Sequence, residues 1–175
     1  MGVPFRRRGR NGGARMGELG EFSLKYKIFL KTYSWRRIDP VPFAPLTKAL
    51  PECRLGLVSS AGFVLPGQEP FDEGVRGGDP SFRCIPWDSD PRDLVEYHKS
   101  DAFDHSGILQ DPNLGFPLER VRELASMGKI GSVAPRHLSF MGSITAPGRL
   151  IKRTAPEAAE IFVEDKVDLA LLVPV

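Results

Sequence analysis

Residues 111–142 constrain the fold more than any other stretch of this 175-residue sequence. The stretch opens on the turn-forming residues Asp111-Pro112-Asn113, and a helix is predicted from about Pro117, because proline is tolerated at the first helical position. Apolar residues then recur at helical spacing and charged residues cover the other face; the apolar ones are Leu118, Val121, Leu124 and Ala125. Gly128 predicts the end of this helix, and residues 130–133 are a predicted short strand.

A polar segment follows that strand directly. Residues 135–142, with the sequence PRHLSFMG, are predicted to form a loop at the carboxyl edge of a sheet, where α/β proteins present side chains to ligands. Arg136 is a candidate for substrate contact because its planar guanidinium group matches a carboxylate. His137 is a second candidate, at the end of the predicted strand. A surface arginine and a structural histidine are the alternatives for these two positions.

Two more apolar segments are predicted strands. Residues 54–58 run into the small residues 59–62, a pattern typical of the first strand and turn of a doubly wound fold, where backbone approaches a ligand. No G-x-G-x-x-G follows, so we do not expect a dinucleotide site. Residues 82–86 form the second of these strands, after a long Gly- and Pro-containing loop over residues 67–80. One or two helical turns are predicted over residues 93–98.

The last segment predicts a helix and then the strongest strand of the sequence. Thr154 and Glu157 form a T-x-x-E capping box that begins a helix, and its buried face is predicted to be Ala158, Ile161 and Phe162. Residues 167–173, VDLALLV, are almost continuously apolar, which predicts a central and parallel strand. Parallel strands need crossover connections, so we expect the sheet to be incomplete at its C-terminal end. Together these elements predict an α/β, Rossmann-like fold with a mostly parallel sheet and flanking helices.

The first 52 residues are predicted to be separate from this sheet. Residues 1–20 are basic and Gly-rich without apolar periodicity, which predicts a disordered tail. Residues 21–52 predict a helix, with a strand as the alternative over residues 22–35, followed by a Pro-rich connector. Residues 53–175 are the predicted α/β domain, the N-terminal part of a larger domain.

Composition limits the partners and the compartment. The formal net charge of +2 is close to balance, so no nucleic-acid partner is expected. No segment is apolar over the length needed to span a membrane, and we expect a cytoplasmic protein. Cys53 and Cys84 are too few and too far apart for a disulfide framework, and both are predicted to be small buried hydrophobic residues.

Polar residues gather between positions 98 and 113. They include two histidines and several acidic residues: His98, Asp101, Asp104, His105, Asp111 and Asn113. Their spacing matches no metal-ligand motif, so no metal site is predicted. Asp104, Asp111 and Asn113 are further candidates for substrate binding. A metal-dependent hydrolase that uses His98, His105 and His137 stays open as an alternative function.

Several blocks of sequence, in order along the chain, carry a resemblance to a known family. The blocks are GLVSSAG (56–62), GDPSFRCIP (78–86), DPN (111–113) with FPLER (116–120), GSVAPRH (131–137) with SFMG (139–142), and VDLALLVPV (167–175). They resemble the selenoprotein B family, the B subunits of glycine, sarcosine, betaine and D-proline reductases. The resemblance runs from about residue 55 to the last residue.

This resemblance implies an oxidoreductase subunit that takes part in reductive cleavage of a C–N bond in a small amine or amino acid. It implies a partner subunit that carries a pyruvoyl group, and a dithiol reductant. In that family the segment like residues 171–175 leads into a selenocysteine followed by Pro-x-Cys. We therefore expect the selenol nucleophile just beyond Val175, no catalytic nucleophile or bound cofactor within residues 1–175, and no activity from this fragment alone. A non-catalytic α/β binding or assembly subunit is the alternative.

Overall fold

The computed structural model describes residues 24–34, 37–98, 100 and 105–175. The predicted disordered tail and the candidate residue Asp104 lie outside these residues. The chain divides into two compact units, residues 1–42 and 43–175. The first unit contains the helix α1 (Leu24–Thr32), within the segment for which the sequence predicts a helix. The predicted domain boundaries stay a prediction.

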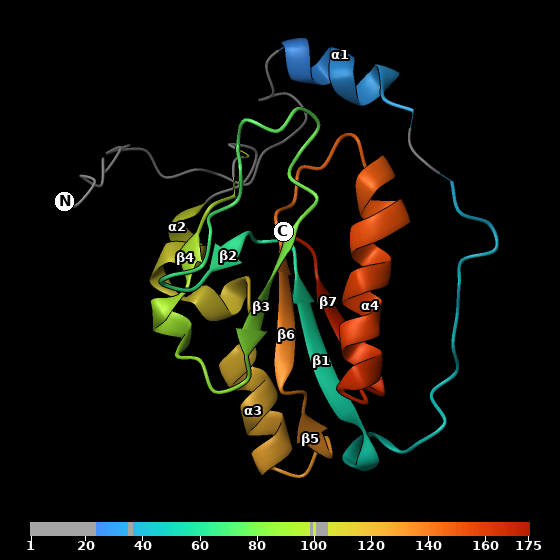
Figure 1. Cartoon of the computed structure of the whole chain (residues 1–175), viewed down its shortest axis with the longest axis vertical. Coiled ribbons are helices and arrows are strands. Elements are labelled where there is room, and N and C mark those ends of the chain that lie inside the picture. Colours follow the sequence, from blue (N-terminus) through green and yellow to red (C-terminus); the bar gives the residue numbers. More distant parts are fainter. Residues whose placement is uncertain (1–23, 35–36, 99, 101–104) are drawn as a thin grey trace. The chain divides into compact units, whose positions relative to one another are not determined.

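The second unit is built on a sheet whose central strand is β1 (Figure 1). Its strands are β1 (Arg54–Ser59), β3 (Phe82–Pro86), β5 (Ser132–Val133), β6 (Arg136–Phe140) and β7 (Leu169–Val173). β1 pairs in parallel with β5 and then β6 along one edge, and in parallel with β7 along the other. β3 pairs antiparallel with β6. The predicted mixed α/β architecture with a mostly parallel sheet is confirmed, whereas the Rossmann-like assignment stays a prediction.

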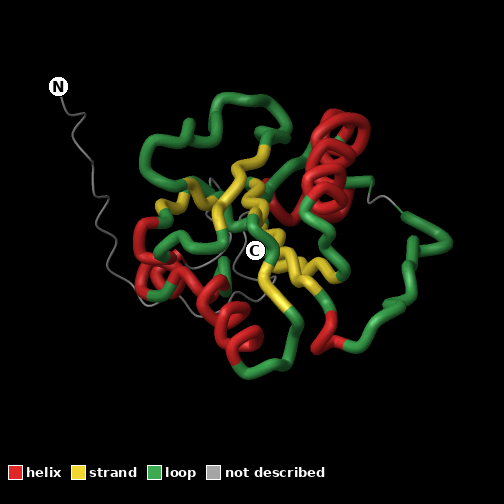
Figure 2. Tube along the Cα trace, turned by 60° about the horizontal axis from the view of Figure 1, so that its bottom comes forward, coloured by secondary structure: helices red, strands yellow, loops and turns green. Residues whose placement is uncertain are grey.

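Two helices cover opposite faces of this sheet. Side chains alternate between faces along a strand, and Leu55 and Leu57 of β1 pack with residues of α3 (Leu118–Ser126). Gly56 points to the other face, where a Cβ would lie 2.8 Å from Cζ of Phe162 in α4 (Ala155–Glu164). Figure 2 shows helices on both sides of the strands.

The remaining elements are short. They are β2 (Phe63–Val64) and β4 (Val95–Glu96), which pair antiparallel, the helix α2 (His105–Gln110), the 3₁₀ turns η1 (Leu50–Glu52), η2 (Pro91–Asp93) and η3 (Pro112–Leu114), and the π-helical turn η4 (Leu150–Thr154). Phe63 and Phe116 meet edge to face in the core beside Leu57 and Leu118. None of the described helices has the length and apolar character needed to cross a membrane.

The prediction of a polar loop over residues 135–142 is wrong for most of these residues. Arg136–Phe140 is the strand β6, which lies between β1 and β3. His137 and Ser139 are both fully buried in it. Polar residue types favour a loop when a sequence is considered alone, but here two neighbouring strands take up the backbone hydrogen bonds and the polar side chains lie inside the protein.

The last predicted strand is observed as β7. It is parallel, as expected, and among the described strands it pairs with β1; its central position stays a prediction. Leu172 is 67% exposed. An apolar run indicates a strand, yet it carries no information on how many neighbours that strand has.

Two predictions about helix ends are corrected as well. Residues 93–98 hold no helical turn beyond the end of η2; the strand β4 follows instead. The capping box at Thr154 is absent: its backbone is helical and its side chain caps no backbone N–H group. A capping residue needs an extended backbone, and here the π-helical turn η4 already continues into α4 from Leu150.

Candidate functional site

The carboxyl ends of the three parallel strands β1, β6 and β7 meet at a pocket. Ligands bind at this edge in open α/β sheets. The pocket has a volume of about 550 Å³. Its lining comes from the ends of β1, β6 and β7, from Ile144, and from the start of the α4 segment; these residues are Val58, Ser59, Ser60, Phe140, Met141, Gly142, Ile144, Leu150, Ala155, Leu172, Val173 and Pro174. Nearly all of these residues are apolar, so the pocket suits the carbon skeleton of a small ligand.

Ser60 connects the segments that leave the three strands. Its N–H group donates to the carbonyl oxygen of Val173 at 3.1 Å, and its carbonyl oxygen accepts from the N–H group of Gly142 at 2.8 Å. Its Oγ accepts from the N–H group of Val175 at 2.9 Å. One serine therefore fixes the exits of β6 and β7 relative to the end of β1. In Figure 1 the C-terminus is marked beside the upper ends of β6 and β1.

Gly142 lies where several polar atoms converge. A Cβ on this residue would lie 2.5 Å from Nε2 of His98, 3.1 Å from the carbonyl oxygen of Ser60 and 3.1 Å from the carbonyl oxygen of Val175. Any side chain would displace the imidazole or the backbone. The absence of a side chain at Gly142 thus lets the His98 ring lie beside Val175.

His98 is held in place by its neighbours. It is only 8% exposed, and its Nδ1 accepts a hydrogen bond from the N–H group of Ser100 at 3.2 Å. In the neutral ring the proton then resides on Nε2, the atom that faces Gly142. Glu96 accepts from the N–H group of His98 at 2.8 Å, and its other oxygen lies 2.9 Å from Nδ1 of His105. We refer to Ser60, Gly142 and His98 as the polar corner; Ser60 and Gly142 line the pocket, whereas His98 lies next to Gly142 and does not line it.

Arg136 lies at the amino end of β6, whereas the pocket is lined from Phe140 at the carboxyl end. Its guanidinium group pairs with Asp165 at 2.7 Å and with Glu164 at 2.9 Å. These two carboxylates keep the pKa of Arg136 above its usual range. Arg136 thus ties the end of α4 to β6, and its predicted contact with substrate stays a prediction.

His137 is buried within the sheet. Its Nδ1 accepts a hydrogen bond from the N–H group of Leu57 at 3.0 Å, between the stretches of β1 that pair with β5 and with β6. Burial lowers the pKa of His137 to about 4, and the charge of Arg122 contributes in the same direction. The ring is therefore neutral at pH 7. It does not line the pocket, and its predicted substrate contact stays a prediction.

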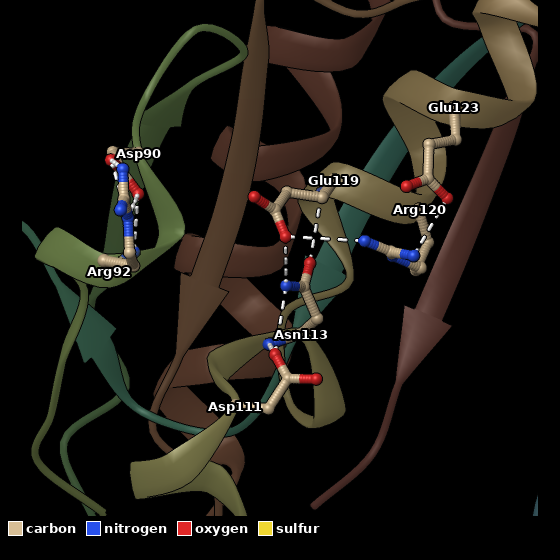
Figure 3. Close-up of polar contacts among 7 residues, drawn as sticks. All are labelled: Asp90, Arg92, Asp111, Asn113, Glu119, Arg120 and Glu123. Atoms are coloured by element: carbon tan, nitrogen blue, oxygen red, sulfur yellow. Dashed lines mark hydrogen bonds and ion pairs between the residues drawn. The ribbon is translucent and has the colours of Figure 1, made fainter.

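Asp111 and Asn113 organise the start of α3 (Figure 3). Asp111 accepts from the N–H group of Asn113 at 3.0 Å. Asn113 in turn accepts from the N–H group of Glu119 at 3.1 Å, and its amide donates to the Glu119 carboxylate at 2.7 Å. Both residues thus have partners within the protein, and their role in substrate binding stays a prediction.

The histidines and the cysteines are the other side chains that could bind a metal ion or act as nucleophiles. The rings of His98 and His105 lie 6.4 Å apart. Within the part of the chain that the structure describes, no group of at least three His, Cys, Asp or Glu side chains is placed to hold a metal ion. Cys53 and Cys84 are free thiols, and burial raises the pKa of Cys84, which keeps it protonated at neutral pH.

The polar corner was not among the candidates that the sequence suggested. Its signals were nevertheless there: a run of small residues after an apolar strand at Ser59–Ser60, and a glycine at the end of the SFMG block at Gly142. His98 was noted as part of a polar stretch and as a residue of the alternative metal-dependent hydrolase, but not as a neighbour of Ser60 and Gly142. Its position beside the strand ends depends on the pairing of β2 with β4, which two-residue strands do not reveal in a sequence.

Comparison with curated proteins finds two related reductase subunits. The chain is 34% identical over 136 residues to D-proline reductase subunit gamma of Acetoanaerobium sticklandii, an alignment that covers 77% of this chain and 54% of the relative. It is 26% identical over 167 residues to sarcosine reductase complex component B subunit beta of Peptoclostridium acidaminophilum, covering 93% of this chain and 37% of that relative. The chain thus spans about half the length, or less, of these relatives.

This homology supports the reductase B-subunit family to which the sequence blocks point. No protein-family model matches the chain. No solved structure matches it either.

Proposed function

We propose that this chain is part of a B-type subunit of an amino-acid reductase, which takes part in the reductive cleavage of a C–N bond in a small amine or amino acid. The observation that carries the proposal is the 34% identity to D-proline reductase subunit gamma over 136 residues. The pocket at the carboxyl edge of β1, β6 and β7 supports it, because this edge is where α/β sheets bind small ligands.

The resemblance to the selenoprotein B family defines the chemistry that other groups bring. In that family a selenocysteine after the segment like residues 171–175 supplies the nucleophile, a pyruvoyl group on a partner subunit activates the substrate amine, and a dithiol supplies the electrons. By that resemblance the selenolate bonds to the carbon as the C–N bond breaks, and the nitrogen leaves with a proton. Two electrons from the dithiol then cleave the C–Se bond, the carbon takes a proton, and the dithiol becomes a disulfide.

Within this chain, Ser60 has the positioning role. Its three hydrogen bonds, to Val173, Gly142 and Val175, fix the direction in which the chain leaves β7. A residue that follows Val175 then begins beside Gly142 and the His98 ring. Positioning of this kind lowers the entropic cost of bringing reacting groups together.

His98 contributes a proton donor at the same corner. Because Nδ1 accepts from Ser100, Nε2 carries the proton and faces the point next to Gly142. A donor there stabilises an anionic nucleophile in its resting form and holds a proton close to the leaving nitrogen.

The apolar lining has a separate role. Phe140, Ile144 and Leu172 surround the pocket with hydrocarbon. This apolar lining lowers the local dielectric constant below that of water, which strengthens the interaction between the His98 N–H group and a negative charge.

The nucleotide sequence beyond the Val175 codon tests the proposal. We expect UGA, then Pro-x-Cys in the same frame and further coding sequence. A UAA or UAG codon, or a UGA codon without a coding continuation, would contradict a selenol nucleophile at this position. It would favour the binding or assembly subunit instead.

A further inference from the structure

A cluster of basic side chains borders the apolar pocket. Arg76 comes from the loop between β2 and β3, and the others come from the segment that begins the α4 region: Arg149, Lys152 and Arg153. With residues 146–148 they line a second hollow of about 540 Å³. Leu150, the neighbour of Arg149, lines the apolar pocket. We name these four cationic residues the basic rim.

Two glycines bring the halves of the basic rim together. The N–H group of Ala146 donates to the carbonyl oxygen of Gly77 at 3.0 Å. A Cβ on Gly77 would lie 2.5 Å from Cβ of Ala146, and a Cβ on Gly78 would lie 2.8 Å from Cα of Ile144. Both glycines have positive φ angles, 88° and 98°. The fold thus packs backbone tightly against backbone at the point where Arg76 meets the Arg149 segment.

The charges of the basic rim are largely uncompensated. Arg153 pairs with Glu157 at 3.0 Å. Arg76, Arg149 and Lys152 are exposed, and none of them forms an ion pair with any residue that the structure describes. The residues that line this second hollow, all of them described, include no acidic side chain. Like charges held close together raise the local positive potential, which an anionic ligand relieves.

We propose that the basic rim is a docking surface for an acidic segment of a partner protein. Sites for small molecules are mostly apolar and enclose their ligand, whereas the cations of this rim are exposed side chains around an open hollow. Exposed charges of one sign are typical of surfaces that steer protein association. The rim borders the apolar pocket, so a docked partner lies next to the proposed reaction site.

The test is fluorescence anisotropy of the complete subunit with a labelled hexaglutamate peptide, and with hexaglutamine as the uncharged probe. The rim variant is Arg76→Glu, Arg149→Glu and Lys152→Glu. The matched control is Lys25→Glu, Lys31→Glu and Lys129→Glu, three exposed lysines outside the rim. Both triple variants change the net charge equally. Circular dichroism confirms that both are folded.

The proposal predicts that hexaglutamate binds to the wild type and to the control, that binding weakens as salt increases, and that the rim variant loses affinity by about tenfold or more. Equal affinity of the rim variant and the control variant overturns it. Displacement of the peptide by inorganic pyrophosphate at lower concentrations than by unlabelled hexaglutamate also overturns it, because that result indicates a small-anion site. Binding is measured without turnover, so failure here is distinct from failure of the proposed reductase function.

Discussion

At the scale of single residues, buried polar groups affect the stability of the fold more than surface charges do. His137 is fully buried, and its ring replaces a backbone partner for the N–H group of Leu57. Its Nε2 has no hydrogen-bond partner among the described residues. Protonation of this ring places a charge inside the sheet without a counter-ion in contact, which is costly.

The pKa of His137 predicts a specific dependence of stability on pH. The folded-state pKa is about 4, below the ordinary value of 6.5. Between these values the unfolded state binds a proton that the folded state does not, so stability falls as the pH is lowered from 6.5 towards 4. The slope from this group is roughly 1.4 kcal/mol per pH unit. Urea unfolding across this range measures it.

The variant His137→Asn is the control for this prediction. Asparagine keeps a hydrogen-bond acceptor for the Leu57 N–H group but does not titrate. The difference in unfolding free energy between wild type and variant should shrink as the pH falls, because only the wild type loses stability through this residue. Parallel pH profiles of the two proteins would contradict a buried, neutral His137.

Gly131 carries a second prediction at this scale. A Cβ on it would lie 2.8 Å from the carbonyl carbon of Glu52 and 2.9 Å from the carbonyl oxygen of Pro51, and both atoms are backbone. Gly131→Ala should therefore destabilise the protein by about 1–3 kcal/mol. Gly148→Ala is the control, since no atom lies within 4 Å of the added methyl group. Thermal unfolding compares them; similar melting temperatures for the two variants would show that the Pro51–Glu52 backbone moves aside.

At the scale of elements, the start of α3 shows how a side chain outside a helix accepts a hydrogen bond from an N–H group of its first turn. Pro117 stands at the N-cap position and provides no side-chain hydrogen bond. Asn113, in the preceding 3₁₀ turn, accepts from the N–H group of Glu119 instead. The helix thus has a cap that is distant in sequence from the usual position.

Removal of this cap should be measurable. We expect Asn113→Ala to lower the unfolding free energy by about 1 kcal/mol, the usual value of an N-cap side chain. Arg120→Ala is the control on the same helix: its ion pairs with Glu119 and Glu123 join exposed side chains (Figure 3). Exposed pairs of this kind contribute about 0–1 kcal/mol. A larger loss for Arg120→Ala than for Asn113→Ala in urea unfolding would contradict this assignment of the cap.

The elements also show how much of the fold the sequence predicts. Strands β1, β3 and β7 and helices α3 and α4 all lie where apolar periodicity indicates them. β6 does not follow that rule, because His137 and Ser139 are polar residues inside the sheet. The position of β7 beside β1 depends on the order of the strands, which is a property of long-range pairing. The polar corner depends on the same pairing, since it joins residues 60, 98 and 142.

At the scale of the whole molecule, the pocket lies at the carboxyl ends of the parallel strands. β1, β6 and β7 all end at the pocket, and Ser60 connects the segments that leave them. Homology to subunits of D-proline and sarcosine reductases supports the family. The proposed reaction site is therefore this edge of the sheet.

The role of His98 is a prediction for the complete subunit assembled with its partner. His98→Gln keeps an N–H donor but removes the imidazole ring, so we expect kcat to fall by about 10²-fold or more because the variant cannot transfer a proton. KM should change little. His105→Gln, in the same hydrogen-bond network but away from Gly142, is the matched control. Equal losses of kcat in the two variants would mean that the network is only structural.

The proposed reductase function is tested most directly by oxidation of a dithiol by the complete subunit with its partner, measured with D-proline, sarcosine, glycine and betaine in turn. We predict that at least one of these compounds supports dithiol oxidation, with the C–N cleavage product formed in equal amount. We also predict that Gly142→Val, which fills the point between His98 and Val175, abolishes this activity while the protein stays folded. A folded, assembled wild-type complex that oxidises no dithiol with any of the four compounds would contradict the proposed function, and a Gly142→Val variant of full activity would contradict the proposed site.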